Sequence, residues 1–223
     1  MPVSELTHSA QDYLKTIWQS TEWSEEPVTV KLLAEKLGFR ASTISEGIRK
    51  LADAELISHQ PYGSVELTAK GRHLALMMIR RHRLLETFLV NSLGYTWDEV
   101  HDEAEVLEHA VSDLMIDRID HFLGYPKHDP HGDMIPSASG EISEHDAVQL
   151  AELEVGVPGT IVRISDESPD MLRFCTELNV TVNQAVTLVS RHPYVDSFVV
   201  RLGEQELPIT LSGLLASAIW VTR

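Results

Sequence analysis

The fold is decided by residues 29–67, which read TVKLLAEKLGFRASTISEGIRKLADAELISHQPYGSVEL. Residues 29–37 have the apolar spacing of a short helix, and the Gly-containing segment 38–40 interrupts it. Ser42 or Thr43 is a suitable N-cap for a further helix that runs to about Ala54. Residues 56–59 and 64–67 then alternate like two short strands around the turn-forming residues 60–63.

One more helix precedes this stretch. Residues 9–21 carry Tyr13, Leu14, Ile17 and Trp18 at helical spacing. The order is therefore helix, helix, turn, helix and β-hairpin, which is the order of a winged helix-turn-helix. Such a domain predicts double-stranded DNA, in the form of an operator, as a partner.

Two long helical segments follow, at residues 69–92 and 97–123, and both carry apolar stripes. The N-terminal domain is too small to cover that much apolar surface, so we expect these helices to form a homodimer interface. Residues 125–144 are rich in Pro, Gly, Ser, His and Asp and are predicted to be a linker.

From residue 147 onward, short apolar runs alternate with turns, at 159–165, 185–189, 197–202, 206–210 and 218–221. That rhythm favours a small SH3-like β-barrel, with Cys175 as a buried core residue. The predicted fold class is thus mainly α with small β parts. The expected domains are a winged helix (1–73), a helical dimerisation and metal-binding domain (74–143) and an SH3-like (FeoA-like) domain (144–223).

Charge is distributed unevenly along the chain. Residues 1–80 contain 10 Asp/Glu and 9 Lys/Arg, a net charge of −1, whereas residues 81–223 contain 24 and 9, a net charge of −15. The DNA-binding part can therefore still present a basic face. With one cysteine, no signal peptide and no apolar run of about 20 residues, the sequence predicts a cytoplasmic protein without a membrane partner.

Candidate metal ligands are concentrated in residues 101–109, which read His101-Asp-Glu-Ala-Glu105-Val-Leu-Glu108-His109. On a helix, Glu105, Glu108 and His109 share one face, with His101 one turn earlier. Two further groupings lie nearby: the i, i+4 pair His82 and Glu86, and the segment 128–133. Such side chains repel one another unless a cation lies between them. Oxygen and imidazole donors suit Mn²⁺, Fe²⁺ or Zn²⁺.

At this point the chain resembles the diphtheria toxin repressor family of metal-dependent regulators. The resemblance covers nearly the whole chain and is carried by five segments, namely Asp12-Tyr13-Leu14, the helix-turn-helix, Arg81-His82-Arg83-Leu84, residues 100–109, and residues 129–136. It implies three domains in the order given above. It also implies a repressor of metal-uptake genes that binds DNA when loaded with metal, with no enzymatic activity and no small organic substrate.

The resemblance implies a primary metal site at Asp12, Glu105, Glu108 and His109. The iron-responsive branch has methionine and cysteine where this chain has Asp12 and Glu105. Hard carboxylates favour Mn²⁺ over softer ions, so manganese is the predicted co-repressor, as in the manganese-responsive branch, and other divalent ions are expected to substitute in vitro. Two-domain manganese regulators carry an acidic residue at the position of Lys15, which argues against a tightly paired two-manganese cluster.

The resemblance implies a second site at His82, Glu86, His101, Asp129 and His131, with a further ligand from the SH3-like domain near Glu167 or Asp170. The recognition helix is residues 42–54. Its expected DNA contacts are Arg40, Ser42, Thr43, Ser45 and Glu46, with Arg49, Lys50 and Lys70 on phosphates.

Three alternatives stay open. The first is an Fe²⁺-dependent repressor with the same mechanism. The second is a metal-dependent hydrolase that uses the carboxylate and histidine cluster as a Lewis acid site, although no nucleophile or general base is evident beside it. The third is a metal-independent winged-helix regulator that binds a small ligand between its long helices.

Overall fold

The computed structural model describes residues 3–59, 63–143, 146–205 and 207–222. The predicted turn at 60–62, the residue Glu206 and the expected domain boundary at residue 144 lie outside these ranges. The chain forms two compact units. The first unit consists of Met1–Leu85, Glu105–Tyr125 and Ile135–Ile142, and the second of Glu86–Ala104, Pro126–Met134 and Ser143–Arg223. The three-domain division expected from the sequence stays a prediction.

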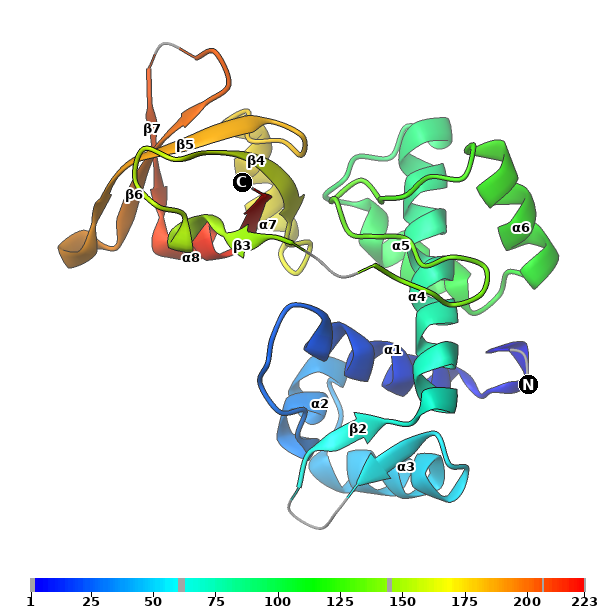
Figure 1. Ribbon diagram of the computed structural model, residues 1–223. Helices are drawn as coiled ribbons and strands as arrows, with labels where there is room; N and C mark the ends of the chain where they lie inside the picture. The colour runs from blue at the N-terminus through cyan, green and yellow to red at the C-terminus, as the bar shows by residue number, and fades with distance from the viewer. Residues whose placement is uncertain (1–2, 60–62, 144–145, 206, 223) are drawn as a thin grey trace. The chain divides into compact units, whose positions relative to one another are not determined.

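The N-terminal part of the first unit is a winged helix-turn-helix. Its elements are a 3₁₀ turn (Val3–Glu5), α1 (His8–Glu22), α2 (Val30–Leu37), α3 (Ala41–Asp53), β1 (Ile57–His59) and β2 (Val65–Leu67). The two strands pair antiparallel, with Ser58 opposite Glu66. Figure 1 shows these helices and the hairpin gathered around the start of α4. The predicted order of elements is confirmed.

The predicted N-cap of α3 is wrong. Gly38 takes a left-handed conformation and ends α2, and α3 already begins at Ala41. Arg40 occupies the N-cap position and makes no side-chain capping bond, so Ser42 and Thr43 lie inside the helix. The carbonyl oxygen of Arg40 accepts hydrogen bonds from the N–H groups of Thr43 and Ile44, at 2.9 and 3.1 Å, so the first turn of α3 already contains the expected capping residues.

The core of the first unit joins α1, α3, the hairpin and α4. Buried Leu14, Ile17, Ile44 and Ile48 belong to one apolar cluster that continues into α4. Gly71 allows the close approach of α4, because a Cβ there would lie 1.8 Å from the carbonyl oxygen of Leu56. The hairpin and α4 are therefore packed backbone to backbone.

The first long helical segment has nearly its predicted length, whereas the second is divided into two helices. α4 spans Ala69–Phe88 and continues as a π-helical turn, Leu89–Leu93. The segment 97–123, predicted as one helical region, forms α5 (Val100–Glu108) and α6 (Asp113–Phe122). Ser112 caps α6 by accepting a hydrogen bond from the Met115 N–H, and this cap begins a new helix.

One buried arginine holds the turn between α5 and α6. Arg81 of α4 donates to the carbonyl oxygens of Glu108 and Val111, at 3.2 and 3.1 Å, and pairs with Asp113. The last carbonyls of α5 are thus satisfied by a cation, which suits the negative end of a helix. Arg81 therefore binds the carbonyl group of Glu108, the residue that directly precedes His109.

The second unit contains a six-stranded antiparallel sheet in the order β3-β8-β4-β5-β6-β7. The strands are β3 (Val148–Gln149), β4 (Pro158–Ile164), β5 (Ala185–His192), β6 (Ser197–Leu202), β7 (Ile209–Ser212) and β8 (Ile219–Thr222). A 3₁₀ turn (Leu150–Glu152), α7 (Pro169–Glu177), a 3₁₀ turn (Pro193–Val195) and α8 (Gly213–Ser217) complete it. The SH3-like fold is confirmed, and Cys175 lies in its core.

The segment predicted to be a linker makes defined contacts within each unit. His128 and Met134 form a β-bridge in the second unit. In the first unit, Arg80 donates to the carbonyl oxygen of Pro136 at 2.9 Å and pairs with Asp120 at 2.6 Å.

Among the described residues, no helix is long and apolar enough to cross a membrane.

Candidate metal centre and DNA-binding surface

Five charged or ionisable side chains of the first unit meet between α1 and α5. α1 supplies Asp12 and Lys15, α5 supplies Glu105 and Glu108, and His109 follows directly. We call this set the α1–α5 cluster. The structure thus brings Asp12, Glu108 and His109 together, and Glu105 joins them through its ion pair with Lys15.

Three of these side chains offer donor atoms to one point. Nε2 of His109 lies 2.9 Å from Oδ1 of Asp12 and 3.8 Å from Oε1 of Glu108. One donor atom from each of the three residues lies within 4.8 Å of the others. Oxygen and imidazole donors at this spacing match what a divalent cation needs.

Lys15 lies against the same carboxylates. Its ammonium is 2.9 Å from Oε1 of Glu105 and 2.6 Å from Oε1 of Glu108. Burial lowers the pKa of Lys15, but the attraction of Glu108 and Glu105 outweighs burial, so the net pKa is raised. Lys15 is therefore charged in the folded chain.

Glu108 is the most buried member of the cluster. Its Oε2 lies 2.5 Å from Nδ1 of His82 on α4, while its Oε1 accepts from Lys15. Burial raises its pKa, but His82 and Lys15 outweigh burial and hold the pKa below the ordinary glutamate value. Asp12 shows the opposite balance, because burial raises its pKa more than His109 and Lys15 lower it.

The charges of the cluster fit a divalent cation. Three carboxylates face the one ammonium of Lys15, and the Glu108 side chain is fully buried, whereas the Asp12 and Glu105 side chains are 37% and 51% exposed. Buried charge of one sign is costly unless it is paired. A divalent ion would add positive charge beside these carboxylates, and Asp12, Glu108 and His109 offer donor atoms close enough to share it.

A second group of donors lies within the second unit. Nδ1 of His101 is 3.3 Å from Oε1 of Glu86 and 3.4 Å from Oδ2 of Asp166. Nδ1 of the fully buried His131 is 4.0 Å from Oε2 of Glu86. Glu86, His131 and Asp166 offer donor atoms within 4.8 Å of one another. We call these four residues the β4-loop cluster, because Asp166 follows β4.

His131 is held in the tautomer that a metal site needs. Its Nε2 lies 2.7 Å from the carbonyl oxygen of Trp97, so Nε2 carries a proton and donates it. Nδ1 is buried and has no hydrogen-bond partner among the described residues. Metal-binding histidines typically donate one ring N–H to a carbonyl or carboxylate while the other nitrogen binds.

Ion pairs set the protonation of the β4-loop cluster. Burial lowers the pKa of His101, but Asp166 and Glu86 outweigh burial and raise it to about 10. Burial raises the pKa of Asp166, but hydrogen bonding to His101 outweighs burial and holds the pKa far below the usual range.

The other residues proposed for the second site are His82, Asp129, Glu167 and Asp170. His82 contacts Glu108 in the first unit. Oδ1 of Asp129 accepts from the backbone N–H groups of His131 and Asp133. Asp170 is exposed and pairs with Arg173, and Glu167 is exposed next to Asp166. Sequence reasoning missed Asp166, which stands one residue before the segment that it examined.

The expected DNA-contacting residues are exposed. Arg40, Ser42, Thr43, Ser45, Glu46, Arg49, Lys50 and Lys70 all reach solvent. Two of them pair, with Nζ of Lys50 2.8 Å from Oε1 of Glu46. Lys70 donates to the carbonyl oxygen of Ala54, at the end of α3, at 3.2 Å. The exposed face of α3 therefore carries both cations and hydroxyl groups.

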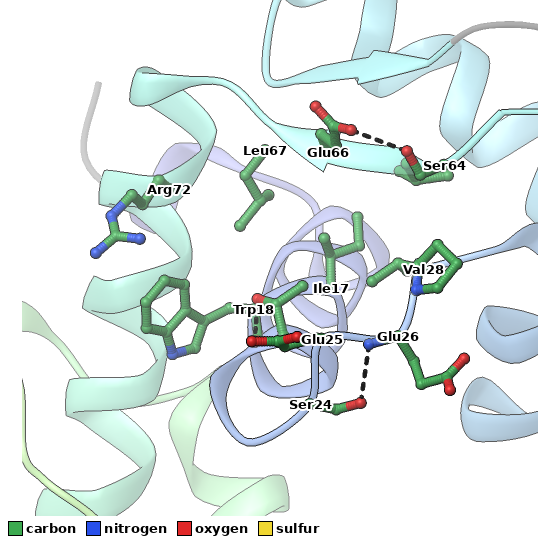
Figure 2. Close-up of a pocket in the computed structure, with 13 residues that line it drawn as sticks. Ile17, Trp18, Ser24, Glu25, Glu26, Val28, Ser64, Glu66, Leu67 and Arg72 are labelled. Atoms are coloured by element: carbon green, nitrogen blue, oxygen red, sulfur yellow. Dashed lines mark hydrogen bonds between the residues drawn. The ribbon is translucent and has the colours of Figure 1, made fainter. Parts of the chain in front are cut away.

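The first unit also has a pocket of about 560 Å³ beside the wing. Figure 2 shows its apolar wall, Ile17, Trp18 and Leu67, with Arg72 beside the ring of Trp18. Carboxylates Glu25 and Glu66 are among its other lining residues. The pocket belongs to the winged helix and is separate from both clusters of metal donors.

Three domain descriptions match the chain in sequence. Residues 5–65 match "Iron dependent repressor, N-terminal DNA binding domain", residues 68–137 match "Iron dependent repressor, metal binding and dimerisation domain", and residues 148–223 match "FeoA domain". The iron-dependent repressor IdeR of Mycobacterium tuberculosis is 34% identical over 167 residues, 72% of each chain.

Solved structures are similar over almost the whole chain. A manganese-dependent transcriptional repressor in complex with manganese is 50% identical, with a TM-score of 0.91, over 96% of this chain and 99% of that one. The manganese regulator SloR is 32% identical, with a TM-score of 0.81, over 98% and 100%. The chain therefore belongs to the iron-dependent repressor family that includes the diphtheria toxin repressor, whose members are dimerising, metal-dependent, DNA-binding transcriptional repressors rather than enzymes.

Proposed function

We propose that this repressor uses Mn²⁺ as its co-repressor and that the ion binds at Asp12, Glu105, Glu108 and His109. The observation that carries this proposal is the donor set of the α1–α5 cluster. It consists of carboxylate oxygens and one imidazole and includes no sulfur, and the donor atoms of Asp12, Glu108 and His109 lie within 4.8 Å of one another. Hard donors favour Mn²⁺ relative to softer ions.

A second ion binds, in this proposal, at the β4-loop cluster. Glu86 and His131 supply buried donors, Asp166 supplies a carboxylate, and His101 lies within 3.4 Å of Asp166. The fixed tautomer of His131 supports a ligand role for its Nδ1. Asp129 has a supporting role, because its Oδ1 accepts two backbone N–H groups and so shapes the turn that presents His131.

The residues of the first unit connect the α1–α5 cluster to DNA binding. α1 packs against α2 and α3 in one apolar core, so the position of Asp12 and the position of the recognition helix α3 are linked. A bound divalent cation would supply the positive charge that allows the carboxylates of Asp12 and Glu108 to lie close together. A link between Asp12 and α5 would restrict the movement of α1. Because α1 and α3 share one apolar core, the movement of α3 would be restricted as well. By linkage, DNA in turn strengthens metal binding.

DNA contacts are proposed for the exposed residues of α3 and its neighbours. Ser42, Thr43 and Ser45 lie at the N-terminal end of α3, the end that meets base edges in helix-turn-helix proteins. Arg40, Arg49 and Lys70 are placed for phosphates. Glu46 and Lys50 pair with each other in the free protein, so one of them must leave this pair to contact DNA.

Fe²⁺ is the second candidate, because relatives named iron-dependent repressors are up to 34% identical to this chain. In both cases the regulated genes are those for uptake of the metal. The donors at positions 12 and 105 distinguish the two ions physically, since carboxylate oxygen is harder than thioether or thiolate sulfur.

The deciding experiment is operator binding, measured by fluorescence anisotropy on a duplex selected from random DNA. Metal-free protein is compared with protein in Mn²⁺, anaerobic Fe²⁺ and Zn²⁺ series, together with Glu105→Ala. Asp102→Ala, on the exposed side of the same helix, is the matched control. Binding that requires Mn²⁺, is lost in Glu105→Ala and persists in the control supports the proposal. A response at lower Fe²⁺ concentration assigns iron, and binding without metal refutes the mechanism.

A further inference from the structure

The side-chain amide of Gln11 connects the α1–α5 cluster to the start of the chain. Gln11 is 2% exposed. Its Nε2 donates to the carbonyl oxygens of Val3 and Leu6, both at 3.1 Å. Its Oε1 lies 2.7 Å from Nδ1 of His109. A neutral, buried side chain thus reaches a residue of the proposed metal site.

The hydrogen-bond partners determine which end of the amide faces His109. Both N–H groups of the Gln11 amide have an acceptor, and both acceptors are carbonyl oxygens that cannot donate. The reverse orientation would place the amide oxygen against two carbonyl oxygens and lose both hydrogen bonds. The network therefore assigns the orientation, as it must where hydrogens are not seen directly.

That orientation fixes the imidazole as well. Because Oε1 of Gln11 only accepts, Nδ1 of His109 must carry a proton and donate it. Nε2 is then the nitrogen whose lone pair can bind a metal ion, and it lies 2.9 Å from Asp12 and 3.8 Å from Glu108. The ring of His8 stacks on that of His109, with centroids 4.8 Å apart, which further restrains the ring.

We propose that Gln11 is a positioning residue of the metal site: it accepts the Nδ1–H of His109 and so presents Nε2 to the divalent cation. This inference rests on the proposed metal site and adds to it a residue that is not itself a ligand. An oriented acceptor on the distal nitrogen also raises the basicity of the ligating one, and loss of such partners typically weakens metal binding about 10- to 100-fold.

Two substitutions separate this role from simple anchoring of the N-terminal turn. Gln11→Met keeps the volume but neither accepts from His109 nor donates to Val3 and Leu6. Gln11→Glu still accepts from His109 but loses at least one of the two donated bonds. Ser20→Ala, buried in the same helix with its hydroxyl bonded to Thr16, is the matched control.

Mn²⁺ binding is measured by isothermal titration, with metal-free melting temperatures to verify that each variant folds. Gln11→Met is expected to bind Mn²⁺ at least 10-fold more weakly, with Gln11→Glu and Ser20→Ala within a few-fold of the parent protein. Equal loss in both Gln11 variants would show that only the N-terminal anchor matters and would overturn the inference. So would unchanged binding in Gln11→Met.

Imidazole ¹⁵N NMR of the metal-free and Zn²⁺-loaded protein, with His109→Gln for assignment, tests the contact directly. A proton on Nδ1 of His109 that exchanges slowly in the parent protein and in Gln11→Glu, but rapidly in Gln11→Met, is the expected result. A proton on Nε2 with Nδ1 bare in the Zn²⁺-loaded protein would overturn the inference. If the parent protein binds no metal, the proposed function fails, while the metal-free spectrum still tests the Gln11 contact.

Discussion

The ammonium nitrogen of Lys15 lies 2.6 Å from Oε1 of Glu108, and neither side chain reaches solvent, with exposed fractions of 4% and 0%. A lysine in this place provides part of the positive charge that the carboxylates between α1 and α5 require. A divalent ion would supply further positive charge beside the same carboxylates.

Lys15→Met is therefore expected to destabilise the metal-free protein. Removing one partner of a buried ion pair costs roughly 3–5 kcal/mol, because it leaves a buried charge unpaired. Urea unfolding in the presence of chelator measures the loss, and saturating Mn²⁺ is expected to restore much of it. Lys31→Met, at a solvent-exposed i, i+4 pair, serves as the control and should change stability by less than about 0.5 kcal/mol. A Lys15→Met protein as stable as its parent would contradict this account.

The metal-free protein should lose stability in alkali through His101. Its pKa is raised from 6.5 to about 10 by Asp166 and Glu86, so its contribution to folding is fully present below pH 6.5 and is lost as the pH rises to about 10. Melting temperatures of metal-free protein across this range test the sign. His101→Gln should flatten the curve, and a parent curve that rises between these pH values would refute the assignment.

Asp166→Asn should reduce the number of bound Mn²⁺ ions from two per chain to one. The carboxylate of Asp166 is one of three donors within 4.8 Å in the β4-loop cluster, and a neutral amide is a weaker ligand for a hard cation. Native mass spectrometry gives the count. Asp170→Asn removes an exposed carboxylate four residues later and is expected to retain both ions. Equal stoichiometry in Asp166→Asn and the parent would exclude this residue as a ligand.

Arg49→Ala should weaken operator binding about equally for all sequences. As a phosphate contact, Arg49 carries charge rather than base specificity, so its loss should reduce the slope of log affinity against log salt by about 1. Anisotropy at several salt concentrations in saturating Mn²⁺ gives the slope. Arg201→Ala, an exposed arginine on β6, is the control. A change confined to one base position would instead indicate direct base readout.

Local patterns predicted much of this structure from the sequence. Helical spacing placed Glu105, Glu108 and His109 on one face, and the resemblance added Asp12 from a distant helix. The recognition of a winged helix rested on turn residues and short alternating strands, which are signals contained within a few residues. The break between α5 and α6 also had a local signal, Ser112 before Asp113, which the apolar stripe concealed.

Other features had no local signal. Asp166 follows a strand, and its proximity to Glu86 and His131 depends on how separate segments of the second unit pack. Gln11 is neutral, and nothing in its neighbourhood indicates that its amide meets His109. Trp97 contributes to the β4-loop cluster only through its backbone carbonyl, which any residue type possesses. Contacts of these kinds arise from tertiary packing, so periodicity and composition do not report them.

His109 and His131 donate from opposite ring nitrogens. His109 gives Nδ1 to Gln11, whereas His131 gives Nε2 to the carbonyl of Trp97. Histidine analogues methylated on a single ring nitrogen, incorporated at one codon, therefore have position-specific effects. An Nδ1-methyl group removes only a supporting hydrogen bond at 109 but blocks the ligand atom at 131, and an Nε2-methyl group does the reverse. One pair of isomeric amino acids can thus block either proposed metal site separately, without changing the charge of the chain.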